Sequence, residues 1–243
     1  MANILIIHGA WSAGWAWKKM RPLLRERGHE VFTPTCSGLG ERAHQANLTV
    51  DLDSHIADML AVLRFEDLHD VVLVAHSYGG MVATGVADRA ASRIAQLVYL
   101  DAFVPRDGQC LFDLVPDAAR ANSIEAVRSH GDGWRIPVNP MPPDTGAADV
   151  AWATPLRQPM PLKCFELPVR LQGAVEALPR SYIYCRRHAP GDVFRPFAER
   201  ARASDDWQYF ELDASHNPHI TMPDTLADLL HRVATGVRAT RPS

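Results

Sequence analysis

The sequence has few of the features that hold small proteins together without a large core. Its 243 residues include four cysteines, and no two of them form a Cys-x-x-Cys pair. This spacing argues against a disulfide framework or a zinc site and predicts free thiols in a reducing compartment. No His-Glu-x-x-His motif or similar set of metal ligands occurs either. We therefore expect an activity that needs neither a metal nor another cofactor.

Long apolar runs and a strong charge imbalance are also missing. No stretch approaches the roughly 18 apolar residues of a membrane span, and the opening Met1–His8 lacks the basic residues that begin a signal peptide. The net charge is −3, with both signs scattered along the chain. This distribution argues against a nucleic-acid or membrane surface. We expect a soluble cytoplasmic protein whose partner is a small molecule, and a homodimer is left open.

The apolar content, 47% of the residues, is that of an ordinary globular protein. The length suits one domain, residues 1–243, with a core that needs no disulfide or structural metal. Short β-rich runs alternate with helix-period segments, which predicts an α/β fold with a mostly parallel sheet flanked by helices. The expected strands are Asn3–His8, Glu30–Thr35, Val71–His76, Ile94–Asp101, Ser181–Arg186 and Gln208–Leu212. The expected helices are Trp15–Arg27, Asp53–Leu63, Gly79–Ala90, Phe194–Ala203 and Asp224–Val237.

One region interrupts this alternation. From about Pro105 to Leu178 the chain is rich in proline and its helical pieces are short. So long an excursion between two sheet strands is usually functional. We interpret residues 105–178 as a helical cap, inserted after the strand that ends at Asp101.

A strand, a tight turn and a helix meet at Ser77. The run Val71–Ala75 is apolar, His76-Ser77-Tyr78 follows, and Gly79 opens an amphipathic helix. This context favours a nucleophile elbow, in which a strained turn exposes a serine hydroxyl. Such a turn needs small residues two positions before and after the serine, here Ala75 and Gly79. The sequence therefore predicts Ser77 as a nucleophile.

Two backbone N–H groups are candidates for an oxyanion hole. The N–H of Tyr78 begins the helix after the elbow, where the helix dipole favours negative charge. A second donor is expected in the glycine-rich bend after the first strand, and we assign it to Ala10. His8, at the end of that strand, is interpreted as a brace for the loop rather than as a base.

A serine nucleophile needs a base that accepts its proton. In this fold the base follows the last strand, and here that loop holds two of the chain's 11 histidines, His216 and His219. We favour His216, which is nearer to the end of the strand, and keep His219 as the competitor.

These motifs resemble the plant methylesterase and hydroxynitrile lyase family of α/β-hydrolases and its bacterial relatives. The resemblance covers nearly the whole chain, including the opening His8–Trp11 and the elbow His76–Gly80. It also includes the spacing of His216 from Pro223 and, as in bacterial members, the segments Gly38–Arg42 and Tyr99–Pro105. The resemblance implies cofactor-free cleavage of esters, or of cyanohydrins on the same scaffold, and some similar bacterial enzymes hydrolyse carbamates.

Two positions separate the branches of this family. The lyases have a threonine where this chain has Gly9, and a lysine directly after the base histidine, where it has Asn217. Both residues favour a hydrolase.

The position of the triad's acid departs from the plant pattern. Counting back from His216 by the plant spacing lands on His188, which cannot act as a carboxylate. The nearest acid, Asp192, is interpreted as a helix cap, and Asp213 is too close along the chain to reach the ring. We favour Asp101, because some α/β-hydrolases hold their acid after this strand, but Asp192 stays open.

The expected pocket is apolar and lined by aromatic side chains. Candidate substrate-binding residues are Trp11, Phe103, Phe112, Trp134 and Trp152. We expect a serine hydrolase that cleaves a small, uncharged ester or carbamate, with aromatic substrates favoured, through an acyl-enzyme on Ser77. The alternatives are a hydroxynitrile lyase and, from another class, a ligand-binding receptor on a hydrolase scaffold.

Overall fold

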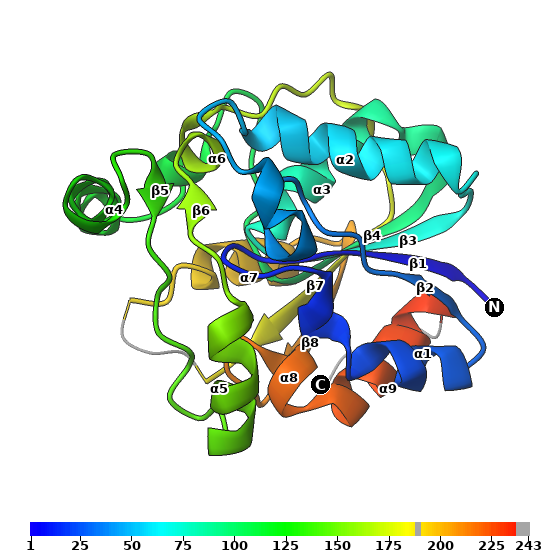
Figure 1. The fold of residues 1–243 in the computed structure, drawn as a ribbon. Helices are drawn as coiled ribbons and strands as arrows, with labels where there is room; N and C mark the ends of the chain where they lie inside the picture. Colours follow the sequence, from blue (N-terminus) through cyan, green and yellow to red (C-terminus); the bar gives the residue numbers. More distant parts are fainter. Residues whose placement is uncertain (188–190, 237–243) are drawn as a thin grey trace.

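The computed structural model describes residues 1–187 and 191–236, and its centre is a six-stranded parallel sheet (Figure 1). The order of the strands across the sheet is β2-β1-β3-β4-β7-β8. Their bounds are β1 Asn3–Ile7, β2 Glu30–Phe32, β3 Val71–Ser77, β4 Ile94–Ala102, β7 Arg180–Cys185 and β8 Trp207–Leu212. All six predicted strands are therefore present, each within three residues of its predicted ends.

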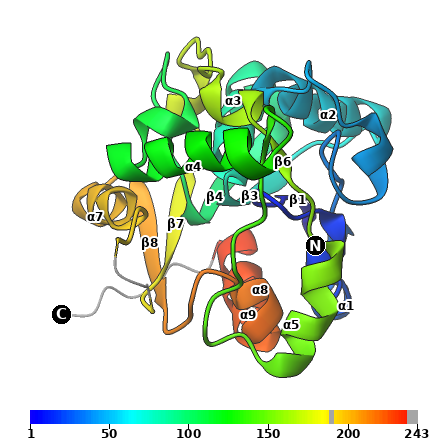
Figure 2. The same ribbon diagram turned by 60° about the vertical axis from the view of Figure 1, so that its left-hand side comes forward.

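Both faces of the sheet are covered, which explains why its strands are continuous apolar runs. On β1, Leu5 and Ile7 face one core, while Ile4 and Ile6 face the other. Helices α2 (Leu52–Phe65), α3 (Gly79–Arg89) and α7 (Arg195–Ala203) cover the first face. Helices α1 (Met20–Glu26) and α9 (Pro223–Ala234) cover the second face, as Figures 1 and 2 show.

Two of the five predicted helices differ from the structure by more than two residues at an end. The first is split into a 3₁₀ turn, Gly14–Trp17, and α1. Pro22 explains the break, because it has no N–H to bond to Lys18 and so fits only the first turn of a helix. The last helix ends at Ala234, and Val237 lies outside the described residues.

Between β4 and β7 lies the excursion that the sequence predicts as a cap. It contains α4 (Asp117–His130), α5 (Ala147–Ala153), α6 (Lys163–Glu166) and a two-stranded antiparallel ribbon. The ribbon strands are β5 Arg135–Ile136 and β6 Met160–Pro161. Short 3₁₀ helices also occur in the excursion, at Leu111–Asp113, Thr154–Leu156 and Ala174–Ala177. In Figure 1, α4 stands out from the sheet, whereas α5 lies beside α8 (Pro218–Thr221).

The order of the strands creates a crevice after β1. The chain leaves β1 for β2 on one side and later returns to β3 on the other, so the loops that follow β1 and β3 diverge. In open α/β sheets, ligands bind at such a switch point, beyond the carboxyl ends of the strands. The excursion is tied to this point, because the Trp11 indole N–H donates to Ile136 O and Gln158 N–H donates to Trp11 O.

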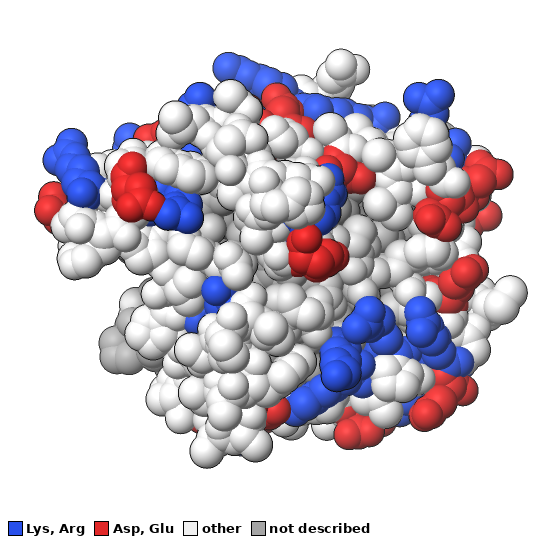
Figure 3. Space-filling model, viewed as in Figure 1, with Lys and Arg blue, Asp and Glu red and all other residues white. Residues whose placement is uncertain are grey.

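Charge on the surface agrees with the small net charge. Figure 3 shows both signs over one face, with Lys and Arg gathered over α1 and the residues just before it. No helix of the described residues has the length and apolarity that crossing a membrane requires.

Candidate active site

Ser77 occupies a strained turn at the junction of β3 and α3. Its φ is 56°, a left-handed conformation that costs a non-glycine residue about 1–3 kcal/mol. The helix start is pressed against neighbouring backbone: a β carbon on Gly79 would lie 2.5 Å from Ile7 O, and one on Gly80 2.0 Å from Phe103 O. The two glycines therefore allow the close packing that holds the turn, and the strained backbone predicted for Ser77 is confirmed.

His216 follows β8, in the loop that leads to α8. Its Nδ1 lies 2.7 Å from Oδ2 of Asp101. Because the carboxylate accepts the Nδ1–H, the lone pair of Nε2 is available to accept a proton. The backbone oxygen of His216 accepts a hydrogen bond from His76 Nε2 at 2.7 Å, and Phe194 stacks on the imidazole with the ring centroids 4.8 Å apart.

Asp101 reaches this histidine because β4 carries an irregularity. His76 pairs with Leu100 and Ser77 pairs with Ala102, so the register shifts here and β4 contains one more residue, Asp101, than β3 does. Bulges of this kind re-aim a side chain near a functional site. The Asp101 carboxylate is fully buried, and its other oxygen accepts the Cys185 backbone N–H at 3.2 Å.

A cavity of about 560 Å³ joins these elements. Ser77 and His216 both line it, together with Gly9 and Ala10 of the loop after β1. Further lining comes from three segments of the chain: residues 139–144 of the excursion, residues 191–194, and residues 215–220 apart from Pro218. The cavity therefore lies at the switch point of the sheet, with a proline-rich stretch of the excursion as one wall.

Comparisons with known proteins agree with this geometry. A model of the "Alpha/beta hydrolase family" matches residues 4–229. The chain belongs to this family. A carbendazim hydrolyzing esterase of Nocardioides sp. (strain SG-4G) is 39% identical over 95% of this chain and 98% of its own length. Methylesterase 17 of Arabidopsis thaliana is 25% identical over 97% of this chain and 92% of its own.

A solved structure of an extracellular α/β-hydrolase from a Paenibacillus species has a TM-score of 0.82 and 26% identity, covering 95% of this chain and 98% of that one. The resemblance to plant methylesterases and their bacterial relatives is therefore confirmed, as is the α/β-hydrolase fold. This α/β-hydrolase is an esterase-type enzyme.

The other acids considered for the hydrolase's triad have different partners. Asp192 accepts the backbone N–H groups of Phe194 at 2.9 Å and Arg195 at 3.2 Å, in the first turn of α7, and the Tyr184 hydroxyl at 2.5 Å. Asp213 is exposed and bonded to Arg187 at 2.6 Å. His188 lies outside the described residues. Asp101 is therefore the acid that is hydrogen-bonded to the His216 ring, and the two backbone N–H groups that Asp192 accepts fit its interpretation as a helix cap.

His219, the competitor for the base, is buried and stacked on Trp17 with the ring centroids 4.6 Å apart. Burial lowers the pKa of His219 well below its usual value, and the neighbouring His76 lowers it further. Its Nδ1 has no hydrogen-bond partner among the described residues. His219 lines the cavity, but the Asp101 carboxylate is hydrogen-bonded to His216.

The aromatic residues of the predicted pocket are spread more widely than expected. Trp11 lines the cavity, whereas Phe103 packs against Phe194 and Phe197, and Phe112 against Phe165. Trp134 lies under Arg135, and Trp152 packs edge-on against Trp15. Phe103, Phe112, Trp134 and Trp152 are absent from the lining formed by the described residues.

Trp15 and Phe194 line the cavity instead, and the sequence analysis did not predict them as pocket residues. The signal for Phe194 was its position beside Asp192, directly ahead of a helix, and the signal for Trp15 was its closeness to Trp11. As for metals, no cluster of three or more His, Cys, Asp or Glu side chains suited to an ion occurs in residues 1–187 and 191–236.

Proposed function

We propose that this α/β-hydrolase cleaves a small, uncharged ester or carbamate through an acyl-enzyme on Ser77. The observation that carries the proposal is the 2.7 Å hydrogen bond between Asp101 and His216 Nδ1, on the cavity wall that also holds the strained Ser77. This is the relationship that a serine nucleophile, its base and an orienting acid require.

The chemistry follows from the positions of the protons. The Ser77 hydroxyl attacks the carbonyl carbon of the substrate while its proton passes to His216 Nε2. Asp101 keeps the Nδ1–H in place and stabilises the imidazolium. The carbonyl π electrons move to its oxygen, and the resulting oxyanion accepts hydrogen bonds from the N–H groups of Ala10 and Tyr78.

Collapse of this intermediate breaks the bond to the leaving group, which takes its proton from His216. Water then attacks the acyl-enzyme, or the carbamoyl-enzyme for a carbamate, with His216 again accepting the proton. Loss of one oxyanion donor typically lowers kcat by about 100- to 1,000-fold, so the two N–H groups carry a large share of the rate.

Two features support an uncharged and aromatic substrate. Trp11, Trp15 and Phe194 line the cavity along with the proline-rich wall, and such flat apolar surfaces suit an aryl group. The charged side chains of the lining are of both signs, with Arg157 and Arg187 beside Asp144 and Asp192, so the lining has no excess of either charge. The name of the Nocardioides relative makes carbendazim, an aromatic carbamate, the first carbamate to test.

Gly9 supports hydrolysis over cyanohydrin cleavage. A β carbon at this position would lie 3.0 Å from both His76 Nδ1 and Ser77 Cβ, which leaves no room for the threonine of the lyases without movement of these residues. Asn217, in the place of the lyase lysine, carries no positive charge for a departing cyanide.

The test is turnover of p-nitrophenyl esters of graded chain length, phenyl esters and carbendazim by the wild type and Ser77→Ala. We expect Ser77→Ala to lower kcat by about 10⁴-fold or more. Ser12→Ala is the matched control, because Ser12 lines the same cavity, and it should retain activity. A fluorophosphonate should modify the wild type at Ser77, as read by mass spectrometry. Near wild-type turnover by Ser77→Ala would overturn the proposal.

A further inference from the structure

The segment after β2, together with the start of the 3₁₀ helix Gly40–Gln45, has no part in the chemistry above. We call residues 35–42 the support loop; it contains the Gly38–Arg42 motif. None of its residues belongs to the cavity lining in the part of the chain that the structure describes. It nevertheless packs tightly against the loop after β1, because a β carbon on Gly40, whose φ is 47°, would lie 2.4 Å from Ala13 Cβ.

The support loop holds the first oxyanion donor through His8. The backbone N–H of Cys36 donates to His8 Nε2 at 3.1 Å, so His8 Nδ1 carries the proton and donates to Gly9 O at 2.8 Å. Gly9 C=O and Ala10 N–H belong to the same planar trans peptide and point in opposite directions. A bond that fixes the Gly9 oxygen therefore also fixes the direction of the Ala10 N–H.

The same loop holds the second donor through His55 of α2. Ser37 O accepts a hydrogen bond from His55 Nε2 at 2.9 Å, which leaves His55 Nδ1 to accept the Tyr78 hydroxyl proton at 2.9 Å. The Tyr78 side chain is fully buried, and its own backbone N–H is the donor beside Ser77. Burial lowers the pKa of His55 to about 4, so the ring stays neutral and keeps one donor and one acceptor.

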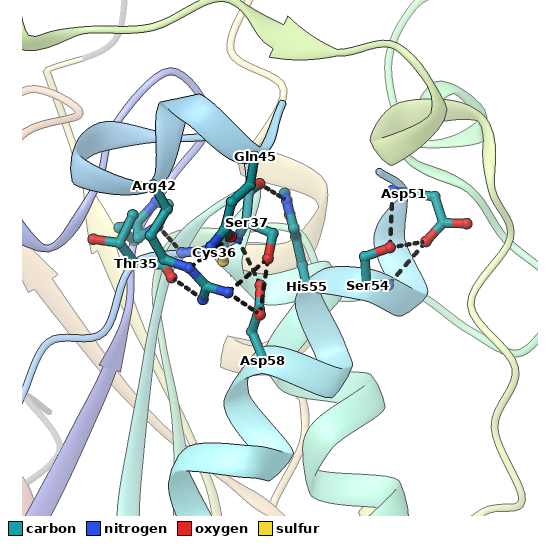
Figure 4. Close-up of polar contacts among 10 residues, drawn as sticks. Thr35, Cys36, Ser37, Arg42, Gln45, Asp51, Ser54, His55 and Asp58 are labelled. Carbon is teal, nitrogen blue, oxygen red and sulfur yellow. Dashed lines mark hydrogen bonds and ion pairs between the residues drawn. The ribbon is translucent and has the colours of Figure 1, made fainter. Parts of the chain in front are cut away.

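Arg42 and Asp58 hold the loop in this position (Figure 4). Arg42 donates from Nη1 to Thr35 O at 2.9 Å and from Nη2 to Ser37 Oγ at 2.8 Å. Asp58, on α2, accepts the Ser37 backbone N–H at 2.6 Å and its hydroxyl at 3.0 Å, and it lies 2.9 Å from Arg42 Nη2. The Arg42–Asp58 pair therefore fixes the backbone around Cys36 and Ser37, whose N–H and C=O groups are bonded to His8 and His55.

We propose that the support loop, held by Arg42 and Asp58, aligns both N–H donors of the oxyanion hole, which makes Arg42 a positioning residue for turnover. The inference rests on the proposed function, because it assigns Ala10 and Tyr78 their roles. Arg42 acts through Cys36–His8 on one donor and through Ser37–His55 on the other. A single change at Arg42 therefore weakens stabilisation of the oxyanion while leaving the substrate-binding walls in place.

The test compares Arg42→Gln with Arg89→Gln. Arg89 forms an ion pair with Asp53 at 2.5 Å, which joins α3 to the same helix, α2, but has no bond to the support loop. For a neutral p-nitrophenyl ester we expect Arg42→Gln to lower kcat about 10-fold or more with little change in KM, since small displacements of catalytic groups have effects of this size. Arg89→Gln should match the wild type.

A second readout separates positioning from stability. The Ser77 hydroxyl adds to the carbonyl carbon of a trifluoromethyl ketone, its proton passes to His216, and the adduct carries an oxyanion. The matching methyl ketone binds without this addition. Arg42→Gln should weaken inhibition by the fluorinated ketone about 10-fold and leave the methyl ketone unaffected. Arg42→Lys should be intermediate, because a lysine keeps the charge near Asp58 but not both donors of the guanidinium.

If Arg42→Gln does not fold, Ser37→Ala takes its place, because it removes only the hydroxyl between Arg42 and Asp58. Equal kcat values in Arg42→Gln (or Ser37→Ala), Arg89→Gln and the wild type would overturn the inference, as would equal weakening of the two ketones. Failure of the proposed function is distinguishable, because the wild type would then escape fluorophosphonate modification at Ser77 whatever the variants do.

Discussion

Phe194 lies flat on the ring of His216, with the two planes inclined by 12° and the centroids 4.8 Å apart. The phenyl ring also borders the cavity and packs against Phe103 at 5.0 Å. It therefore covers one face of the proposed base at the wall of the cavity. Aromatic stacking of this kind contributes about 0.5–1.5 kcal/mol beyond burial.

Replacement of this ring should affect turnover more than a matched replacement nearby. Phe194→Ala is expected to lower kcat/KM for phenyl esters about 10-fold, which corresponds to about 1.4 kcal/mol. Phe197 is the control, because it contacts Phe103 from the first turn of α7 and is not among the described residues that line the cavity. Phe197→Ala should lower the free energy of unfolding by about 3–5 kcal/mol yet keep kcat/KM per folded enzyme. Equal kcat/KM losses in both variants would contradict a role for Phe194 at the site.

The acid of the proposed triad can be identified by a pair of amide substitutions. Asp101→Asn should lower kcat by roughly 10⁴-fold, because the amide disfavours the tautomer of His216 that accepts the Ser77 proton. Asp192→Asn should cost about 1 kcal/mol of stability through a weakened cap on α7 and leave kcat near that of the wild type. Steady-state kinetics and urea unfolding of both variants measure this, and the reverse pattern would assign the acid to Asp192.

The tight approach of Gly9 to the elbow predicts a steric effect on turnover. Gly9→Ala places a β carbon 3.0 Å from His76 Nδ1 and Ser77 Cβ, so the loop after β1 must shift together with the Ala10 N–H. We expect kcat to fall about 10- to 100-fold. Gly146→Ala is the control, because nothing lies within 4 Å of its β carbon. Unchanged kcat in Gly9→Ala would show that the loop tolerates the shift.

Buried histidines predict a loss of stability in mild acid. Burial lowers the pKa of His55 to about 4 and of His76 to about 3, and it lowers those of His8 and His219 as well. Their folded pKa values lie below the unfolded value of about 6.5, so the unfolded chain binds more protons over that interval. The stability is complete above about pH 6.5 and falls as the pH drops toward the folded values.

Each such histidine lowers the free energy of unfolding by about 1.4 kcal/mol per pH unit within its window. Urea titrations at pH 7, 6 and 5 should therefore show a midpoint that moves to lower urea as the pH falls. A midpoint independent of pH over this range would mean that these side chains are not held neutral in the folded protein.

The fold and the elbow could be predicted because their signals are local. A strand covered on both faces must be apolar throughout, and the turn at Ser77 needs small neighbours within a few residues. The place of His216 follows from the last strand and the final helix. The bond between Asp101 and His216 depends on a register shift between β3 and β4, and no pattern in Ala95–Asp101 reveals a bulge.

The cavity wall was less accessible to sequence reasoning. Whether Trp134 or Trp152 faces a substrate depends on the path of an excursion with short elements, and both side chains pack elsewhere. The role proposed for the support loop could not be predicted from the sequence for a related reason. Cys36, Ser37 and Arg42 act on residues far away in the sequence, and only the folded chain brings them to His8, His55 and Asp58.

Trp11 connects the excursion, residues 105–178, to the loop after β1 that contains the proposed oxyanion donor. Its φ of 57° holds it in a left-handed conformation, its indole is bonded to Ile136 and its carbonyl to Gln158, and Ala10 is its neighbour in the chain. Substitutions in the excursion that enlarge or reshape the cavity are therefore expected to displace Trp11, which is next to the proposed oxyanion donor Ala10. In an evolving lineage, a new substrate range and the retained turnover number would therefore have to be selected together, because Trp11 connects the excursion to the Ala10 N–H.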